Sequence, residues 1–285
     1  MQRIGIDVAS FPAATLPGRI WFSNGTTSAA SASDMPLAFL DDAFVPRGPW
    51  REPFATELDD MLIHDDKPLK DSAASRVKLF RVPSAWYDEL AGAVSEIAHS
   101  GDLPNLEQAS RAGQKAVTEE HARRLTNYAS ELVGGPLRFY SGWRLGYWGP
   151  GRITATANRQ TPGGQLIGLH IDTWQSRSVD HRCQAPSLIS INVGVEDRHF
   201  MYVDLDVAEI FQRLSKENLT DTMMFDQTAH MPARFFSAFA SYPVTRITLA
   251  PGEGYIAPVE NIIHDASTET KRLLDVFVAC RIHLS

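Results

Sequence analysis

Two histidines and one aspartate are the residues of this chain whose types and spacing could do chemistry. His170 and Asp172 are separated only by Ile171, and His264 follows far downstream. In an extended strand, side chains two positions apart point to the same face, so His170 and Asp172 can bind one ion together. Two imidazoles and one carboxylate are the facial triad that holds non-heme Fe(II) and leaves positions open for oxygen chemistry. These residues therefore form a candidate iron site.

The sequence contains a second histidine-x-aspartate motif, at residues 64–66. It lies in a charged stretch that Pro68 closes and that lacks strand-forming residues after it. His170 instead lies near the end of the segment 165–172, which is typical of a strand and carries Gly168 two positions earlier, where a ligand could approach closely. The context therefore favours the motif at His170.

The residues before His264 indicate how a distant histidine could reach the first pair. A glycine-rich turn at 251–254 is followed by a short apolar segment at 255–258. If the sheet closes as a jelly roll, this segment would bring the imidazole back toward His170. Any one of the three residues alone is more often a hydrogen-bonded core histidine or a loop cap. Their order and strand context together favour a metal centre.

The second half of the chain has the pattern of a mainly β protein. Short apolar segments with glycine and proline between them predict strands at about 136–148, 152–159, 165–172, 187–195, 199–205, 244–249, 255–258 and 272–283. Eight strands fit a double-sheet jelly roll. One helix capped by Asp206 interrupts them, and residues 231–240 are a candidate for another.

The first half is predicted to be loop-rich and helical. Residues 1 to about 70 show little periodicity and indicate loop, and a strand at 76–82 stops at Pro83. Ser84 can cap a helix, and Thr118 can cap a second one that ends at Gly134. The apolar positions expected to face the core from these helices are Trp86, Leu90, Val94 and Ile97 in the first, and Leu125, Tyr128, Ala129, Leu132 and Val133 in the second.

Bulk composition favours one soluble domain that acts on small molecules. The 285 residues are 44% hydrophobic and 21% charged, which suits a single globular domain. A net charge of -7 argues against a general nucleic-acid or anionic-membrane surface, and no stretch is apolar enough for a membrane helix. Cys183 and Cys280 lack C-x-x-C spacing, so we expect core-filling thiols in a reduced cytoplasm. A homodimer is left open.

With these motifs in place, the chain resembles the Fe(II)/2-oxoglutarate-dependent dioxygenase superfamily over about residues 136–285. The resemblance implies a double-stranded β-helix (jelly roll, cupin-like) for 136–285, with the N-terminal region 1–135 contributing helices packed outside. It also implies His170, Asp172 and His264 as iron ligands, with Fe(II), 2-oxoglutarate and O2 as cofactor and cosubstrates. The distal carboxylate of 2-oxoglutarate would be bound by an arginine after the distal histidine.

Arg272 is the first choice for that arginine, because a guanidinium pairs bidentately with a carboxylate. Two departures from the family pattern weigh against it: the interval after His264 is short, and Leu274 stands where many members have serine or threonine. Arg281 is the second choice. Lys271 is a remaining option, although its position suggests a solvated turn lysine.

The resemblance also bears on the reaction. Related halogenases have a small residue at the carboxylate position, whereas Asp172 fills it here, so hydroxylation with release of succinate and CO2 is favoured. Desaturation, epoxidation or cyclisation stay open because they share the same first hydrogen abstraction. An alternative of another class is a cupin-like metal or ligand-binding protein without turnover, in which His181 or His199 would join the metal shell.

Candidate substrate residues lie next to the motif. They are Arg152, Thr154, Thr156 and Asn158, which alternate on one predicted strand face, and Trp174 and Arg177 on the following loop. An aromatic wall with a cation would suit a carboxylate-bearing substrate. The alternative is that the polar stripe faces solvent, that Trp174 packs internally and that Arg177 lies on the surface. These residues suggest a small polar metabolite such as an amino acid, an acylated amino acid or a natural-product intermediate.

Overall fold

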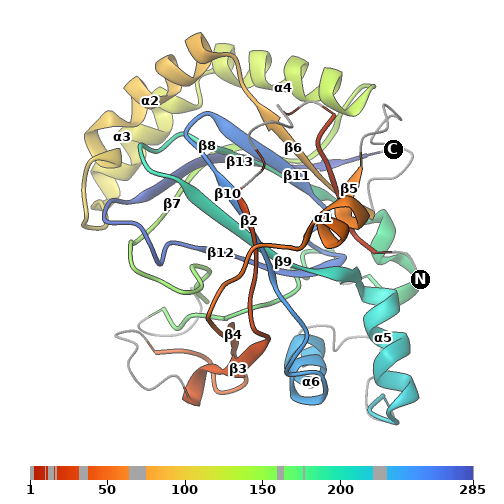
Figure 1. The fold of residues 1–285 in the computed structure, drawn as a ribbon. Helices are drawn as coiled ribbons and strands as arrows, with labels where there is room; N and C mark the ends of the chain where they lie inside the picture. The colour runs from red at the N-terminus through yellow and green to blue at the C-terminus, as the bar shows by residue number, and fades with distance from the viewer. Residues whose placement is uncertain are drawn as a thin grey trace.

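A computed structural model shows two β-sheets that share a core, with helices on their outer sides (Figure 1). The structure describes residues 3–9, 11, 16, 18–31, 38–63, 75–158, 164–175, 177–220 and 230–284. Among the helices in these ranges, none has the length and apolar character needed to cross a membrane. The prediction of a mainly β protein with flanking helices is confirmed.

The described residues form strands in both halves of the chain, with three consecutive helices between Arg81 and Arg138. The strands are β1 (Gly5–Asp7), β2 (Ile20–Phe22), β3 (Thr26–Ser28), β4 (Phe44–Pro46), β5 (Leu62–Ile63), β6 (Arg76–Arg81), β7 (Arg138–Trp148), β8 (Ser187–Asn192), β9 (Arg198–Asp206), β10 (Thr245–Leu249), β11 (Glu253–Ala257), β12 (Ile262–Ser267) and β13 (Asp275–His283). The helices are α1 (Ala55–Met61), α2 (Ser84–Ala98), α3 (Leu106–Ala116), α4 (Glu119–Val133), α5 (Val207–Lys216) and α6 (Met231–Ala238), with 3-10 turns η2 (Ala29–Ser31) and η5 (Val179–Gln184).

The strands form three sheets. One has seven strands in the order β5-β1-β6-β11-β8-β13-β7, another has four in the order β12-β9-β10-β2, and β3 pairs with β4. Pairing is antiparallel except where β1 meets β5 and β6. The N-terminal region was predicted as loop up to about residue 70. That prediction is wrong, because β1 and β5 extend the larger sheet and β2 extends the smaller one.

The core between the two sheets follows from the alternation of side chains along each strand. On β9, Phe200 and Tyr202 pack in the cluster that also contains Tyr255 of β11, so they face the other sheet. Met201 and Val203 belong instead to the outer cluster with α5 and α6. Because side chains alternate every second residue, Arg198 shares the inward face of Phe200.

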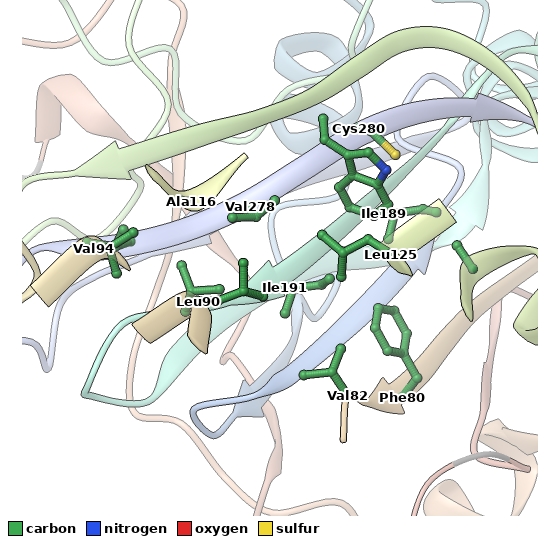
Figure 2. Packing of buried hydrophobic residues seen from close by; sticks show 14 of the residues in the cluster. Phe80, Val82, Leu90, Val94, Ala116, Leu125, Ile189, Ile191, Val278 and Cys280 are labelled. Atoms are coloured by element: carbon green, nitrogen blue, oxygen red, sulfur yellow. The ribbon is translucent and has the colours of Figure 1, made fainter. Parts of the chain in front are cut away.

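Helices α2, α3 and α4 cover the outer face of the seven-stranded sheet (Figure 1). Leu90 and Val94 of α2 pack with Ile191 of β8 and Val278 of β13, as Figure 2 shows. The sequence predicted α2 and α4 at nearly the observed bounds, but α3 was missed.

The predicted helix ends are partly confirmed. Thr118 accepts a hydrogen bond from the His121 amide at the start of α4, and Gly134 ends this helix with φ 76°. The cap predicted at Ser84 is wrong, because Ser84 is the first residue of α2 and Pro83 precedes it without a side-chain cap. Asp206 caps α5 as predicted, accepting from the Glu209 amide.

Six of the eight strands predicted in the second half are present, and the two that are not lie around the candidate metal site. Segment 152–158 and segment 164–172 make only isolated bridges. Gly168 has φ +78°, which interrupts an extended chain and is open mainly to glycine. The observed β12, which carries His264, was not predicted as a strand.

The two cysteines differ. Cys280 is buried in the core beneath the helices (Figure 2), as predicted, whereas Cys183 is exposed and the prediction of a core role for it is wrong.

Leu90 offers a test of the helix-to-sheet packing. Leu90→Ala should lower the free energy of unfolding by about 2–5 kcal/mol, because it removes a side chain that is only 2% exposed and leaves a cavity. Leu106→Ala is the matched control, since Leu106 is 88% exposed and its removal should cost less than about 0.5 kcal/mol. Urea unfolding measures both, and equal losses would contradict the packing described.

Candidate metal centre

His170 and His264 lie side by side because their backbones pair directly. The amide of His170 donates to the carbonyl of His264 at 3.1 Å, and the reverse bond is 2.8 Å. The ring centroids are 4.7 Å apart. A single reciprocal pair of this kind therefore joins the motif segment to β12, although the segment is not a continuous strand.

Asp172 completes the cluster. One ligand atom from each of His170, Asp172 and His264 lies within 4.8 Å of the others, and His170 Nε2 is 3.5 Å from Asp172 Oδ1. The amide of Asp172 donates to the carbonyl of Val259 at 3.2 Å, which fixes this residue against the loop between β11 and β12. Within the described ranges, this is the group of three ligand-type side chains that could hold a metal ion.

Both imidazoles are oriented by backbone carbonyls. His170 Nδ1 lies 2.9 Å from the carbonyl oxygen of Gly168, and His264 Nδ1 lies 3.4 Å from that of Ile262. A carbonyl can only accept, so each Nδ1 carries a proton and each Nε2 is the atom left to bind a metal. This is the orientation that metal-binding histidines need.

Gly168 serves this orientation in a way that its sequence position did not indicate. We expected a small residue that would let a ligand approach. A Cβ at Gly168 would instead lie 2.6 Å from the carbonyl oxygen of Phe44, so the close approach is that of the chain at β4. The positive φ also directs the Gly168 carbonyl to the His170 ring.

A second carboxylate, Asp265, supports His170 from behind. Its Oδ1 accepts from the amides of Thr156 and Ala266, at 3.2 and 2.6 Å, and from the Thr156 hydroxyl at 2.8 Å. Its Oδ2 lies 3.7 Å from His170 Nδ1 and has no hydrogen bond among the described residues. Asp265 is fully buried, so it adds a fixed negative charge beside the ring.

Arg281, on the inward face of β13, contacts the aspartate of the cluster. Its Nη2 donates to Asp172 Oδ2 at 2.8 Å, which leaves Oδ1 toward His170. The ring of Trp174 covers the guanidinium, with Arg281 Cζ 4.5 Å from the ring centroid. Arg281 therefore orients the Asp172 carboxylate and packs against the ring of Trp174.

A buried ion pair supports the loop that carries Asp172. Arg182 Nη1 donates to the carbonyl of Asp172 at 3.0 Å and lies 3.6 Å from Glu260 Oε2. The same Glu260 oxygen accepts from the amide of Gln175 at 3.1 Å. The loop is thus held on both sides of Trp174.

The charges of the cluster distribute its protons unevenly. Burial disfavours a charged His170, but Asp172 and Asp265 outweigh burial and raise its pKa to about 10. Burial and the charged His170 lower the pKa of His264 to about 4. Although burial opposes it, His170, His264 and Arg281 hold the pKa of Asp172 well below its usual range. In the metal-free cluster, the additional proton therefore sits on His170 at neutral pH.

The candidates for the cosubstrate arginine lie apart. Arg272 is exposed in the turn before β13, where its amide donates to Glu196 Oε2 at 3.0 Å, so it is not in the cluster. Arg281 is in the cluster. Lys271 was predicted to be solvated, which is wrong, because it is 5% exposed and its Nζ lies 3.3 Å from Asp275 Oδ1.

The polar stripe predicted before the motif does not form a shared strand face. The Arg152 backbone bonds with Thr268, and Thr154 is fully buried with its hydroxyl unpaired among the described residues. Thr156 reaches the cluster through Asp265, whereas the amide of Asn158 donates to the carbonyl of Gln165. Of these four, Thr156 is the one joined to the metal cluster by a described contact.

The loop residues follow the prediction in part. Trp174 is 60% exposed above the cluster, so it does not pack internally. Arg177 donates to Gln175 Oε1 at 2.6 Å and to Gln184 Oε1 at 3.3 Å, so its guanidinium holds the loop.

The histidines of the alternative metal shell lie outside the cluster. His181 contacts the Ser178 hydroxyl and His199 contacts the hydroxyl of Thr270. The rival motif at residues 64–66 falls outside the described residues.

Sequence reasoning missed Asp265 and Arg198. Arg198 is 3% exposed on the inward face of β9, and its Nη1 donates to Ser190 Oγ at 2.7 Å. Its signal was the two-residue spacing to Phe200 and Tyr202, which places a cation on a buried strand face. Asp265 could have been noticed because it directly follows His264.

No protein-family model matches the sequence, and no curated protein matches it. Several solved structures do match it. The chain is similar to the Kdo hydroxylase KdoO, a non-heme Fe(II) alpha-ketoglutarate-dependent dioxygenase, in complex with succinate and Fe(III), at 12% identity over 82% of this chain and 85% of that one, with a TM-score of 0.44. Its cobalt(II) complex gives 13% identity, coverages of 82% and 86%, and a TM-score of 0.46.

A second similar structure is the epimerase SnoN in complex with Fe3+, alpha ketoglutarate and nogalamycin RO. It has 12% identity, covers 70% of this chain and 84% of that chain, and has a TM-score of 0.35.

Loss of the aspartate should strongly weaken metal binding. Asp172→Ala should weaken Co(II) binding by more than about 100-fold, because removal of an outer partner alone typically costs 10- to 100-fold. His64→Ala is the matched control and should bind Co(II) as the unmodified protein does. Equilibrium titration with Co(II) measures both, and loss of binding in the control alone would move the site to residues 64–66.

Metal binding should also release one proton. Between about pH 6 and 8 the His170 ring carries its additional proton while His264 is neutral, so the ion displaces one proton and its affinity rises about tenfold per pH unit. Calorimetric titration with Co(II) in buffers of different ionisation enthalpy counts the protons. An affinity that does not change with pH would contradict the assigned protonation.

Proposed function

We propose that this protein is an Fe(II)- and 2-oxoglutarate-dependent dioxygenase that hydroxylates a C–H bond of a small polar metabolite. The observation that carries the proposal is the convergence of His170, Asp172 and His264 within 4.8 Å, with each Nδ1 held by a backbone carbonyl. Iron bound there would couple the oxidation of 2-oxoglutarate to succinate and CO2 to the insertion of one atom of O2 into the substrate. Two imidazoles and one carboxylate suit Fe(II) and leave positions for these molecules.

The order of the strands supports a double-stranded β-helix. The core strands of the larger sheet run β7-β13-β8-β11, and those of the smaller run β12-β9-β10, with the His170 segment bridged to the edge of β12. Strands that follow one another in the chain thus alternate between the two sheets from β10 onward, as in a jelly roll. The triad lies where the first segment and β12 meet.

The protein's own residues would orient the metal ligands and exclude water. Arg281 holds one oxygen of Asp172, and Asp265 holds the His170 ring from the other side. The aromatic rings of Phe200 and Tyr255 stack at 4.1 Å on the inward face beside His264. A buried apolar wall of this kind keeps water from the reacting C–H bond.

We assign the distal carboxylate of 2-oxoglutarate to Arg198 in place of Arg272. The pairing of His264 with Tyr202, and of Ala266 with Phe200, places Arg198 further along the same inward face. Its guanidinium reaches back to Ser190, which lies opposite Ala279. Ala279 is two residues from Arg281, which contacts the metal ligand Asp172. The position that the Arg198 guanidinium reaches is thus about 7 Å along the strand from Arg281, a span that a five-carbon dicarboxylate can bridge.

Charge balance at Arg198 favours a bound carboxylate. Arg198 Nε lies 3.3 Å from Asp275 Oδ2, and Lys271 Nζ lies 3.3 Å from Asp275 Oδ1. Two buried cations thus share one buried carboxylate. The contact of Arg198 Nε with Asp275 is an ion pair but not a hydrogen bond, and Nε has no hydrogen-bond acceptor among the described residues. A second carboxylate would neutralise the group, as buried charges require.

The activity test is formation of succinate. The Fe(II)-loaded protein, supplied with O2 and 2-oxoglutarate, should form succinate, and a small-molecule panel should contain a compound that gains one oxygen atom by mass spectrometry. Asp172→Ala should form none. A product that has lost two hydrogens would instead favour desaturation or cyclisation, and absence of succinate with every compound would favour a cupin-like binding protein.

The assignment of the cosubstrate site has its own test. Arg198→Met should raise the dissociation constant for 2-oxoglutarate at least about 30-fold, since truncating one partner of a buried charge pair costs roughly 2–5 kcal/mol. Arg198→Lys retains the charge and should lose less. Arg272→Met is the matched control and should bind normally, and the reverse result would restore Arg272.

A further inference from the structure

We propose that the substrate is a carboxylic acid with a flat apolar portion, bound by Arg281 and Trp174. This inference rests on the proposed function, because it names the substrate class of that site. Arg281 would take the carboxylate and the open face of Trp174 would take the apolar portion.

The first observation is an unused donor next to the metal ligands. Arg281 Nη2 donates to Asp172, but Arg281 Nη1 is buried and has no hydrogen-bond partner among the described residues. A buried donor without an acceptor is costly, and a guanidinium pairs best with an oxyanion that can meet its planar fork. Nη1 and Nη2 are bonded to the same carbon, and Nη2 contacts the metal ligand Asp172. An acceptor bound at Nη1 would therefore lie close to the metal site.

The second observation is that Trp174 is exposed yet held in place. Its side chain stacks on Arg281, and the Tyr140 hydroxyl donates to its carbonyl at 3.5 Å. The next residue, Gln175, bonds to Glu260 through its amide and contacts His283 Nε2 through its side chain at 3.3 Å. A fixed indole that remains 60% exposed offers a surface for a planar or apolar group.

The third observation is the positive charge around His283, the neighbour of Gln175. Burial is the larger cause of the lowered pKa of His283, and the cations Arg138 and Arg177 lower it further. Two carboxylates lie near Arg281. Asp172 is bonded to Arg281 itself, and Glu260 is paired with Arg182. Arg138 and Arg177 near His283, together with Arg281 beneath Trp174, therefore favour an anion over a cation.

A second exposed aromatic residue, Tyr140, lies beside Trp174. Tyr140 is 43% exposed, and its ring packs edge-on against His283 with centroids 6.0 Å apart. Exposed aromatic rings gathered beside a candidate active site mark a binding surface more than a structural core. A substrate with a carboxylate alone would leave these rings uncovered.

Binding can be measured without turnover. The protein of residues 1–285, loaded with Zn(II) and saturated with 2-oxoglutarate, is titrated with 4-fluorophenylacetate, indole-3-acetate and N-acetylphenylalanine, each compared with its primary amide. At least one acid should bind, and its amide should bind at least about tenfold more weakly, because a charge-assisted hydrogen bond is lost. Fluorine NMR and calorimetry give the dissociation constants.

The variants assign the binding to the two residues. Arg281→Met and Trp174→Ala should each weaken binding of the acid at least about tenfold. Arg281→Lys should retain part of the affinity. The matched control is Arg124→Met, because Arg124 also stacks on a tryptophan, Trp86, but on the helices that cover the sheet. The affinity of Arg124→Met for the acid should be unchanged. Thermal unfolding verifies that each variant is folded.

The contrary outcomes are distinct. Equal binding of acid and amide, absence of binding by every acid, or full affinity in Arg281→Met would overturn the proposal. Displacement of the acid by 2-oxoglutarate would also overturn it, because Arg281 would then serve the cosubstrate. Binding of an acid without succinate formation in the iron-loaded protein would keep the carboxylate site and reject the dioxygenase assignment.

Discussion

The reciprocal backbone pair between His170 and His264 is the contact on which the rest of the site depends. A metal centre needs ligands from distant parts of the chain at fixed separations, and two hydrogen bonds bring these two residues into register. Asp172 then lies within reach because it follows His170 by two residues and is fixed to Val259. The positive φ of Gly168 lets the segment leave the extended conformation just before this pair.

Burial of charge imposes the second constraint. The cluster concentrates Asp172 and Asp265 in the interior, and each needs a partner since an isolated buried carboxylate is strongly disfavoured. His170 and Arg281 supply the positive charge at one end of the inward face, and the Arg198–Asp275–Lys271 group lies at the other. The polar interior is thus divided into two sites, with aromatic side chains between them.

Local sequence patterns predicted most elements, whereas residues that depend on three-dimensional packing were harder to find. Apolar periodicity with Thr118 and Gly134 indicated α4, and the same logic indicated most strands. The segment around His170 resembled a strand, because periodicity does not reveal that a glycine adopts positive φ. The triad was predictable from residue type and order. Arg272 was favoured as an arginine that follows His264 and can pair with a carboxylate, but the turn before β13 leaves it exposed, and only strand pairing reveals Arg198.

The most direct test of the account is X-ray absorption at the iron edge of the anaerobic Fe(II)-loaded protein, before and after addition of 2-oxoglutarate. We predict two imidazole ligands, otherwise oxygen ligands, and a chelate signature on addition of 2-oxoglutarate with both imidazoles retained. Three or more imidazoles, a sulfur ligand, or a spectrum that 2-oxoglutarate leaves unchanged would contradict an iron centre built from His170, Asp172 and His264.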